Sequence, residues 1–231
     1  MKSIITSCIV LSRVDFQEAD RILTLLTPDH GKLSVIAKGV RKPRSKLAGG
    51  IELLSVSNVS ILQGRGSVAT LISSRLDIHY GEITKDIKRT MLAYDFLKRT
   101  NKVTEEGAEE EYFELLNNSL NGLNEISVPV PVVDLWYNSR LLSTLGYSPN
   151  VSTDDSGKKL AESKSYIFDY ESSSFSENQQ GQFVVNDIKL LRLALSSSAS
   201  PRKLGMIKDS EKYVSNVLAL VKSLLQQSVR I

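Results

Sequence analysis

Five short runs of strand-forming residues in the first third of the chain constrain its fold more than any other feature. These runs, rich in β-branched and other apolar residues, are residues 3–12, 19–27, 33–37, 53–62 and 68–72. Turn signals lie between them, including Thr27–Gly31, which holds a proline, an aspartate and a glycine. Because no helical period interrupts the runs, a small barrel is predicted over residues 1–80. A five-stranded OB-fold is the most economical barrel, and an SH3-like barrel is the alternative.

The spacing of apolar residues changes at Glu82 from strand-like to helical. The expected helices are residues 83–97, 109–123, 132–145, 187–195 and 211–227. Gly146 is expected to end the third helix, and Asn186 is available to cap the fourth. The predicted fold class is therefore α+β, with an OB-fold barrel at 1–80 and a mainly α-helical domain at 81–231.

A serine-rich insertion at residues 151–182 separates the third and fourth expected helices. Within it, residues 164–170 have the composition of a strand, and residues 171–174 that of a turn. We therefore expect a small β-hairpin inside the helical domain.

The stretch from Gly31 to Gly50 is basic and contains no acidic residue. Its six cations are Lys32, Lys38, Arg41, Lys42, Arg44 and Lys46. Residues 1–80 hold 11 Lys+Arg and 6 Asp+Glu, whereas residues 81–231 hold 18 and 20, so the surplus positive charge belongs to the barrel. A basic loop that leaves a strand favours an anionic partner such as nucleic acid. A solvated surface loop is the alternative interpretation.

Residues suited to catalysis or metal binding are sparse. The single cysteine, Cys8, excludes an internal disulfide and a thiolate zinc cluster, and its apolar strand indicates a buried thiol. The neighbouring carboxylates Asp15, Glu18 and Asp20 are flanked by arginines, which favours a surface ion-pair network over a metal site. We expect no enzymatic activity, no cofactor and no metal.

No run of about 18 apolar residues is present, so a membrane span is not expected. The N-terminal residues lack the apolar region and cleavage site of a signal peptide. These features predict a cytoplasmic protein with no membrane partner.

Aromatic residues are scarce in the predicted barrel, where Phe16 and Tyr80 are the only ones. Stacking on aromatic rings contributes much of the affinity of many single-strand-binding OB-folds. This barrel can stack at most one or two bases, so binding is expected to be mainly to phosphates and to tolerate single or double strands. If all six cations contacted phosphates, log K against log salt would slope at about −4 for single strands.

Three segments near the start of the chain stand out together: Glu18–Thr27 (EADRILTLLT), His30–Leu33 (HGKL) and Ala37–Leu47 (AKGVRKPRSKL). In this order they resemble the opening of the RecO family of bacterial recombination mediators. Farther along, Leu141–Pro149 (LLSTLGYSP) is similar to the end of a helix in that family. The order of barrel and helical domain also agrees with the family.

The resemblance implies a non-enzymatic role in DNA repair and recombination. RecO-type proteins bind single- and double-stranded DNA, promote annealing, and work with RecR to load RecA onto strands coated by single-strand binding protein (SSB). The helical domain of the family receives the acidic, apolar C-terminal tail of SSB, which requires an apolar pocket with a basic rim. A cytoplasmic, nucleoid-associated location is implied.

Candidate site residues follow from the basic loop and the resemblance. The DNA-binding candidates are Lys32, Lys38, Arg41, Lys42, Arg44, Lys46 and Arg65. The candidates for binding the SSB tail are Arg140, Lys88, Arg89, Lys98 and Arg99. Alternative functions are a protein-interaction adaptor and an RNA-associated OB protein, neither with a role on DNA.

The chain departs from the family in the insertion, where many members carry a four-cysteine zinc site. Residues 151–182 contain no cysteine or histidine. Asp154–Gly157 and Phe175–Asn178 occupy the expected positions of the two cysteine pairs. We expect no zinc, and an insertion held by its hairpin alone or partly mobile.

Overall fold

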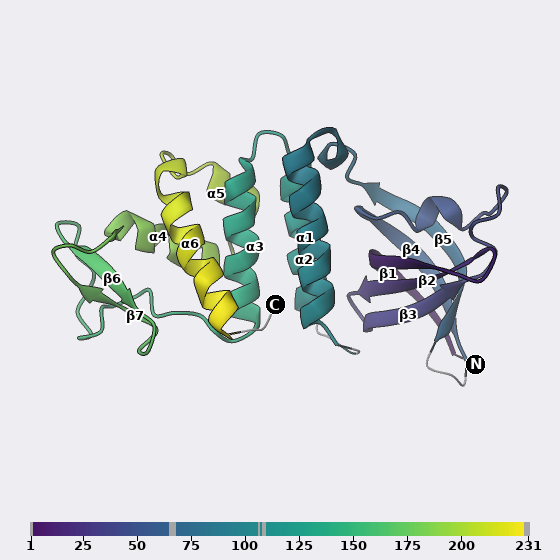
Figure 1. Cartoon of the computed structure of the whole chain (residues 1–231), viewed down its shortest axis with the longest axis horizontal. Helices are drawn as coiled ribbons and strands as arrows, with labels where there is room; N and C mark the ends of the chain where they lie inside the picture. The colour runs from purple at the N-terminus through teal and green to yellow at the C-terminus, as the bar shows by residue number, and fades with distance from the viewer. Residues whose placement is uncertain (1, 65–67, 106, 108–109, 229–231) are drawn as a thin grey trace. The chain divides into compact units, whose positions relative to one another are not determined.

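The computed structural model describes residues 2–64, 68–105, 107 and 110–228. The chain divides into two compact units, Met1–Asn124 (unit 1) and Glu125–Ile231 (unit 2) (Figure 1). Unit 1 holds a five-stranded barrel and two α-helices, and unit 2 holds helices and a small sheet, so the predicted α+β class is confirmed. The predicted division after residue 80 follows the change from strands to helices, whereas in the structure the first two helices belong with the barrel to unit 1.

The barrel has the strand order of an OB-fold. Its strands are β1 (Lys2–Phe16), β2 (Asp20–Thr27), β3 (Gly31–Ala37), β4 (Ser55–Gln63) and β5 (Ala69–His79). They close in the order β1-β2-β3-β5-β4, with β1 also paired to β4. Only β3 and β5 are parallel among these pairs. This arrangement confirms the OB-fold over the SH3-like alternative.

Alternate residues of the strands fill the barrel interior, as the two-residue period of a strand requires. Leu23 and Leu25 on β2 and Val35 and Ala37 on β3 are fully buried there. Cys8 lies in the same core, 1% exposed, and burial raises the pKa of its thiol to about 12. The prediction of a buried thiol is confirmed, and the thiol stays protonated at neutral pH.

Two barrel strands are longer than the sequence predicts. The first predicted strand ends at residue 12, whereas β1 continues to Phe16 and leaves only residues 17–19 as the turn before β2. Polar side chains are accommodated here because the partners across the strands carry opposite charges, as Asp15 and Arg21 do. β5 likewise continues past the predicted end at residue 72, and its pairing with β4 supplies the backbone hydrogen bonds.

Two helices pack on the barrel within unit 1. After a short 3-10 helix η2 (Ile83–Lys85), α1 (Ile87–Val103) and α2 (Glu110–Asn124) follow. α1 contacts β1, and α2 contacts β2. Tyr80, 1% exposed, donates its hydroxyl to Asn117 Oδ1 on α2 at 2.5 Å, so the end of β5 is tied to the helices.

Unit 2 is a helical bundle built around one central helix. Its helices are α3 (Val130–Thr144), α4 (Val185–Leu195), α5 (Pro201–Gly205) and α6 (Glu211–Ser228). α3 contacts the other three. Lys222 Nζ on α6 lies 2.7 Å from Asp134 Oδ2 on α3, which links the two helices. None of the helices in the described ranges is both long enough and apolar enough to cross a membrane.

The ends of α3 and α4 test two predictions from the sequence. Gly146 has a φ of +83°, and the N–H of the residue after it donates to Leu142 O at 3.0 Å, so the predicted glycine stop is confirmed. The predicted cap Asn186 is wrong, because it lies inside α4. Asp187 instead accepts the N–H of Val184 at 2.8 Å, which satisfies a donor at the helix start.

The serine-rich insertion forms a three-stranded antiparallel sheet. Its strands, in the order β7-β6-β8, are β7 (Ser174–Glu177), β6 (Ser165–Asp169) and β8 (Phe183–Val184). The predicted hairpin corresponds to β6 and β7, and β8 is an addition that the sequence did not indicate. Phe175 contacts Phe168 and Phe183 edge to face, with ring centroids 5.1 and 5.5 Å apart, so aromatic packing holds the sheet.

Candidate nucleic-acid interface

The basic loop between β3 and β4 is fixed at its start to the turn between β1 and β2. The N–H of Arg41 donates to Ala19 O at 2.9 Å, and the N–H of Gly39 donates to Asp20 Oδ1 at 2.7 Å. Gly39 has a φ of +63°, a conformation that favours glycine. The loop and the β1–β2 turn therefore lie at the same end of the barrel (Figure 1).

The other end of the loop is held against β5. A short 3-10 helix η1 (Ala48–Gly50) follows the loop, and Ser74 Oγ on β5 donates to Leu47 O at 2.9 Å. A Cβ atom on Gly50 would lie 2.6 Å from Ser74 Cβ, so a larger residue would displace one of the two segments. The loop is therefore hydrogen-bonded to the barrel at both of its ends.

Two acidic residues next to the loop, Asp15 and Glu52, are paired with arginines. Arg21 Nε lies 2.8 Å and Arg41 Nε 3.5 Å from the carboxylate of Asp15, and Arg13 Nη1 lies 2.8 Å from Glu52 Oε2. The hydrogen bond from Arg21 lowers the pKa of Asp15, so this carboxylate stays charged at neutral pH. The predicted surface ion-pair network is confirmed for Asp15, which pairs with Arg21 and Arg41, while Arg13 pairs with Glu52.

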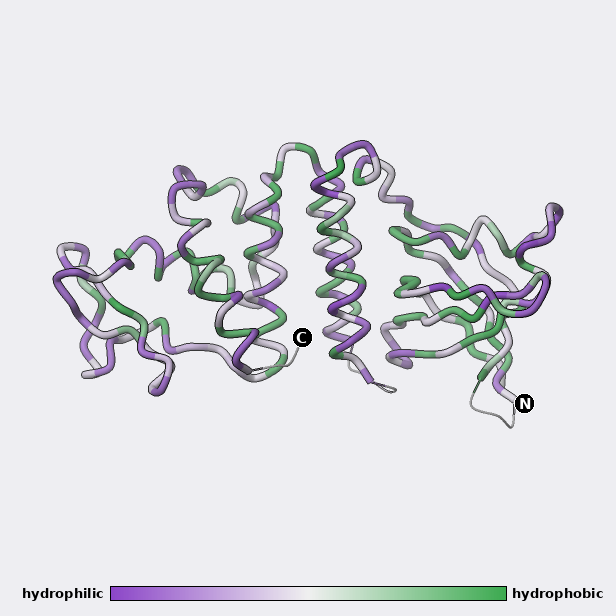
Figure 2. Tube along the Cα trace, in the orientation of Figure 1, coloured by the Kyte–Doolittle hydropathy of each residue, from purple (hydrophilic) through white to green (hydrophobic). Residues whose placement is uncertain are grey.

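Four other cations of the loop are exposed and have no internal partner. They are Lys38, Lys42, Arg44 and Lys46. Within the described part of the chain, their side chains form no hydrogen bond or ion pair. Figure 2 shows the loop as a hydrophilic segment at the end of the barrel. Exposed, unpaired positive charge of this kind suits a phosphate backbone. Arg65, another predicted site residue, lies outside the described residues.

Three predicted site residues donate to the C-terminal ends of helices. Lys32 Nζ donates to Asn101 O in the last turn of α1 at 2.9 Å, and Arg89 Nη1 donates to Leu123 O in α2 at 2.7 Å. Arg140 Nη1 donates to the last carbonyl of α4 at 2.9 Å. Cations stabilise the negative ends of helix dipoles and satisfy free carbonyls there. These side chains therefore have structural roles within their own units.

The residues predicted to bind the SSB tail are divided between the two units. Lys88 and Lys98 are exposed on α1, and Arg99 Nε pairs with Asp95 Oδ2 at 2.8 Å on the same helix. Arg89, also on α1, is buried. These residues belong to unit 1, whereas Arg140 belongs to unit 2.

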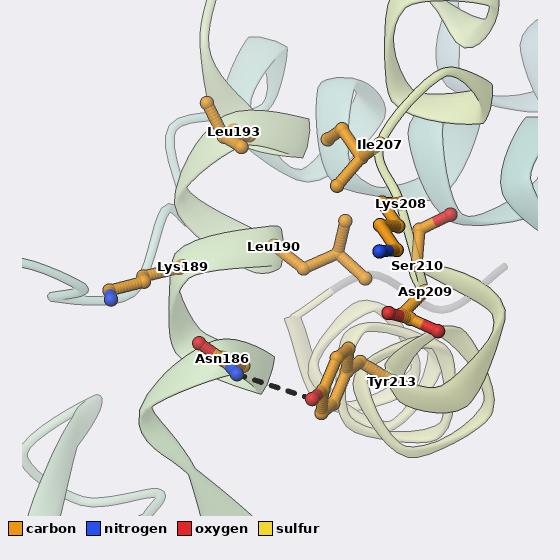
Figure 3. A pocket seen from close by; sticks show the side chains of 9 residues that line it. All are labelled: Asn186, Lys189, Leu190, Leu193, Ile207, Lys208, Asp209, Ser210 and Tyr213. Atoms are coloured by element: carbon orange, nitrogen blue, oxygen red, sulfur yellow. Dashed lines mark hydrogen bonds between the residues drawn. The ribbon is translucent and has the colours of Figure 1, made fainter. Parts of the chain in front are cut away.

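A pocket of about 310 Å³ lies in unit 2 beside α4 and the start of α6 (Figure 3). Leu190, Ile207 and Tyr213 point towards one another and form an apolar floor. Exposed Lys208 stands on the rim, whereas Lys189 points away and pairs with Glu162 at 2.7 Å. The sequence did not indicate this site, because the segment after α5 has no helical period that would place Lys208 next to α4.

The two segments at the family's zinc positions are joined by hydrogen bonds. Asp155 donates its N–H to Phe175 O at 2.9 Å, and its Oδ2 accepts from Ser176 Oγ at 2.8 Å. The carboxylate of Asp154 accepts from Ser156 Oγ at 2.8 Å, which lowers the pKa of Asp154. Zinc favours thiolate and imidazole ligands, so these carboxylates do not fit a structural zinc site. In the described ranges, no group of three or more His, Cys, Asp or Glu is placed to hold a metal.

Comparisons with known proteins match both parts of the chain to one family. Residues 1–76 match the family model "Recombination protein O N terminal", and residues 85–231 match "Recombination protein O C terminal".

Two proteins named "DNA repair protein RecO" illustrate the likeness. The one from Heliobacterium modesticaldum is 30% identical over 230 residues, 94% of this chain and 82% of its own length. The one from Moorella thermoacetica is 36% identical over 144 residues, 62% of this chain and 53% of its own. The match thus spans about half the length of the Moorella relative.

Proposed function

The chain belongs to the RecO family, and on this premise we propose that it is a DNA repair and recombination mediator that binds DNA through its basic loop. It acts by binding, without catalysis, on both single- and double-stranded DNA. It promotes annealing and, with RecR, the loading of RecA onto single strands coated by SSB. Its place of action is the cytoplasm, at the nucleoid.

The exposed charge of the basic loop is the observation that supports this proposal best. Lys38, Lys42, Arg44 and Lys46 are free to contact phosphates, and two nearby acids, Asp15 and Glu52, are paired with other arginines. Phosphate contacts fix nucleic acid without reading its sequence. They also reduce the repulsion between two complementary strands, which is the physical requirement of annealing.

Charge reversal tests the DNA-binding proposal. We expect Lys42→Glu/Arg44→Glu to bind labelled single- and double-stranded oligonucleotides far more weakly than the wild type in fluorescence anisotropy, and to lose annealing. Arg41 is left unchanged because it anchors the loop. The control Lys158→Glu/Lys159→Glu changes the charge equally at exposed positions of the insertion.

Three outcomes would contradict the DNA-binding proposal. Unchanged binding by the loop variant would place the DNA site elsewhere. Absence of DNA binding by the wild type at physiological salt would favour the protein-interaction adaptor, and tighter binding to RNA of equal length would favour the RNA-associated protein.

We also propose that the pocket in unit 2 receives the C-terminal tail of SSB. An acidic, apolar peptide needs an apolar floor and a cation at the rim, and Leu190, Ile207, Tyr213 and Lys208 meet this requirement. Asp209 also lines the pocket and is paired with Lys212 at 2.7 Å, so Lys208, Asp209 and Lys212 together carry one positive charge.

Titration of a labelled SSB tail peptide tests this assignment. We expect Lys208→Glu to weaken peptide binding, while Lys159→Glu leaves it unchanged. Equal affinities for both variants and the wild type would refute the pocket as the tail site without affecting the DNA-binding proposal.

A further inference from the structure

Phe16 is the accessible aromatic residue of the barrel. Residues 1–80 contain two aromatic residues. Tyr80 is 1% exposed and hydrogen-bonded to Asn117 on α2, whereas Phe16 is 38% exposed. Phe16 ends β1, directly before a turn in which Gln17 has a φ of +51°. The ring is therefore partly covered by the barrel and partly open to a ligand at the tip of the hairpin.

The side chain of Phe16 lies on the outer face of the barrel. In the register of β1 and β2, Val14 pairs with Ile22, and Ile22 pairs with Ile36 on β3. These residues alternate with the inward-facing core, so they and Phe16 share the outer face. Val14 is 62% exposed, and the two isoleucines are partly exposed. Phe16 therefore borders an apolar row on the outside of three strands.

The hairpin of β1 and β2 is hydrogen-bonded to the start of the basic loop. Phe16 pairs with Asp20, and the Asp20 carboxylate accepts the N–H of Gly39, next to the exposed Lys38. An aromatic ring and an apolar row thus lie beside unpaired cations. This combination fits a ligand with planar apolar groups on a polyanionic backbone, which describes a single-stranded nucleic acid. A duplex keeps its bases stacked inside, so it offers phosphates and base edges but no free base face for a ring to stack on.

We propose that Phe16 stacks on an unpaired base and makes the barrel prefer single strands to duplex. This inference rests on the proposed DNA-binding function, and it adds a source of selectivity that the basic loop alone does not provide. The loop holds the phosphates of either form. The ring gains a partner only where a base is free, so its contribution is specific to single strands.

Substitution of Phe16 tests the inference in the full chain. We expect Phe16→Ala and Phe16→Leu to weaken single-strand binding by about 5- to 20-fold, the lower part of the range for aromatic stacking, and to leave duplex binding unchanged. Phe16→Trp should retain the preference. The control Ile5→Ala removes an apolar side chain, 80% exposed, nearer the start of β1, and should change neither affinity.

The outcomes separate this inference from the proposed function. If Phe16→Ala binds single strands like the wild type while Lys42→Glu/Arg44→Glu does not, stacking is refuted and DNA binding through the loop stands. If Phe16→Ala weakens the binding of single strands and of duplex equally, Phe16 only supports the structure of the basic loop, and the proposed preference for single strands is refuted. If neither variant affects binding, both proposals fail.

Crosslinking of the wild type provides a second test that does not depend on a folded variant. We expect a single strand carrying 5-iodouracil to crosslink, on irradiation, to the tryptic peptide Val14–Arg21, which contains Phe16. Crosslinks confined to other peptides would overturn the proposal.

Discussion

The salt dependence of DNA binding measures how many of the loop's cations contact phosphates. Each contact releases condensed counterions, so log K falls linearly with log salt concentration. Six basic residues lie in the stretch from Gly31 to Gly50, but Lys32 donates to α1 and Arg41 pairs with Asp15. We therefore expect four contacts, from Lys38, Lys42, Arg44 and Lys46.

Four contacts correspond to slopes of about −2.8 for single strands and about −3.6 for duplex. Between about 50 and about 200 mM salt, the affinity should then fall about 50-fold for single strands and about 150-fold for duplex. Neutralising two contacts with Lys42→Gln/Arg44→Gln should halve the slope for single strands to about −1.4, equivalent to a fall of about 7-fold over the same range.

Fluorescence anisotropy at four or five salt concentrations gives these slopes directly. The variant Lys158→Gln/Lys159→Gln has the same change in net charge at exposed positions of unit 2 and should keep the wild-type slope. An equal reduction in both variants would show that net charge, and not the loop, governs binding. A wild-type slope close to zero would refute the account of phosphate contacts.

Two further predictions concern the stability of the barrel end that carries the loop. Gly50→Ala should lower the free energy of unfolding by about 1–3 kcal/mol in urea titrations, because its Cβ would overlap Ser74, while Gly49→Ala, with open space around it, should have little effect. Because Arg21 lowers the pKa of Asp15 from the ordinary 3.8, this pair stabilises the protein above that pH and the stabilisation is lost as pH falls through the lower, folded value. Asp15→Asn should therefore be less stable than the wild type at about pH 6, and the difference should shrink near pH 2; an equal difference at both pH values would refute the pairing.

The barrel was predictable because its strands carry a local signal. The β-branched runs and the turn at Thr27–Gly31 indicate both boundaries of β2, β3 and β4 within two residues. The second half of β5 carries no such signal, since most of its residues are exposed, and only the pairing with β4 makes it a strand. The local composition of a strand shows which of its side chains are buried on one face of the sheet. Pairing between strands depends on residues far apart in the chain, so an exposed strand segment has no local signal.

The positions of the charged residues could likewise be predicted where they depend on neighbours in the sequence, and not where they depend on contacts between distant segments. Lys38, Lys42, Arg44 and Lys46 lie in one loop, so their clustering follows from the sequence alone. By contrast, Lys32 reaches a carbonyl 69 positions away, and the order of residues does not show that contact. The pocket next to Lys208 depends in the same way on the packing of α4, α6 and the segment between α5 and α6.

Residue-level protection by DNA tests the central claim most directly. Lysine acetylation followed by mass spectrometry, with and without a single-stranded oligonucleotide at low salt, reports which amines the DNA covers. We predict slower modification of Lys38, Lys42 and Lys46 in the complex and unchanged modification of Lys158 and Lys159, which are also exposed but lie in the insertion. Unchanged modification of the three loop lysines under conditions where the DNA is bound would contradict the claim that this loop is the DNA interface.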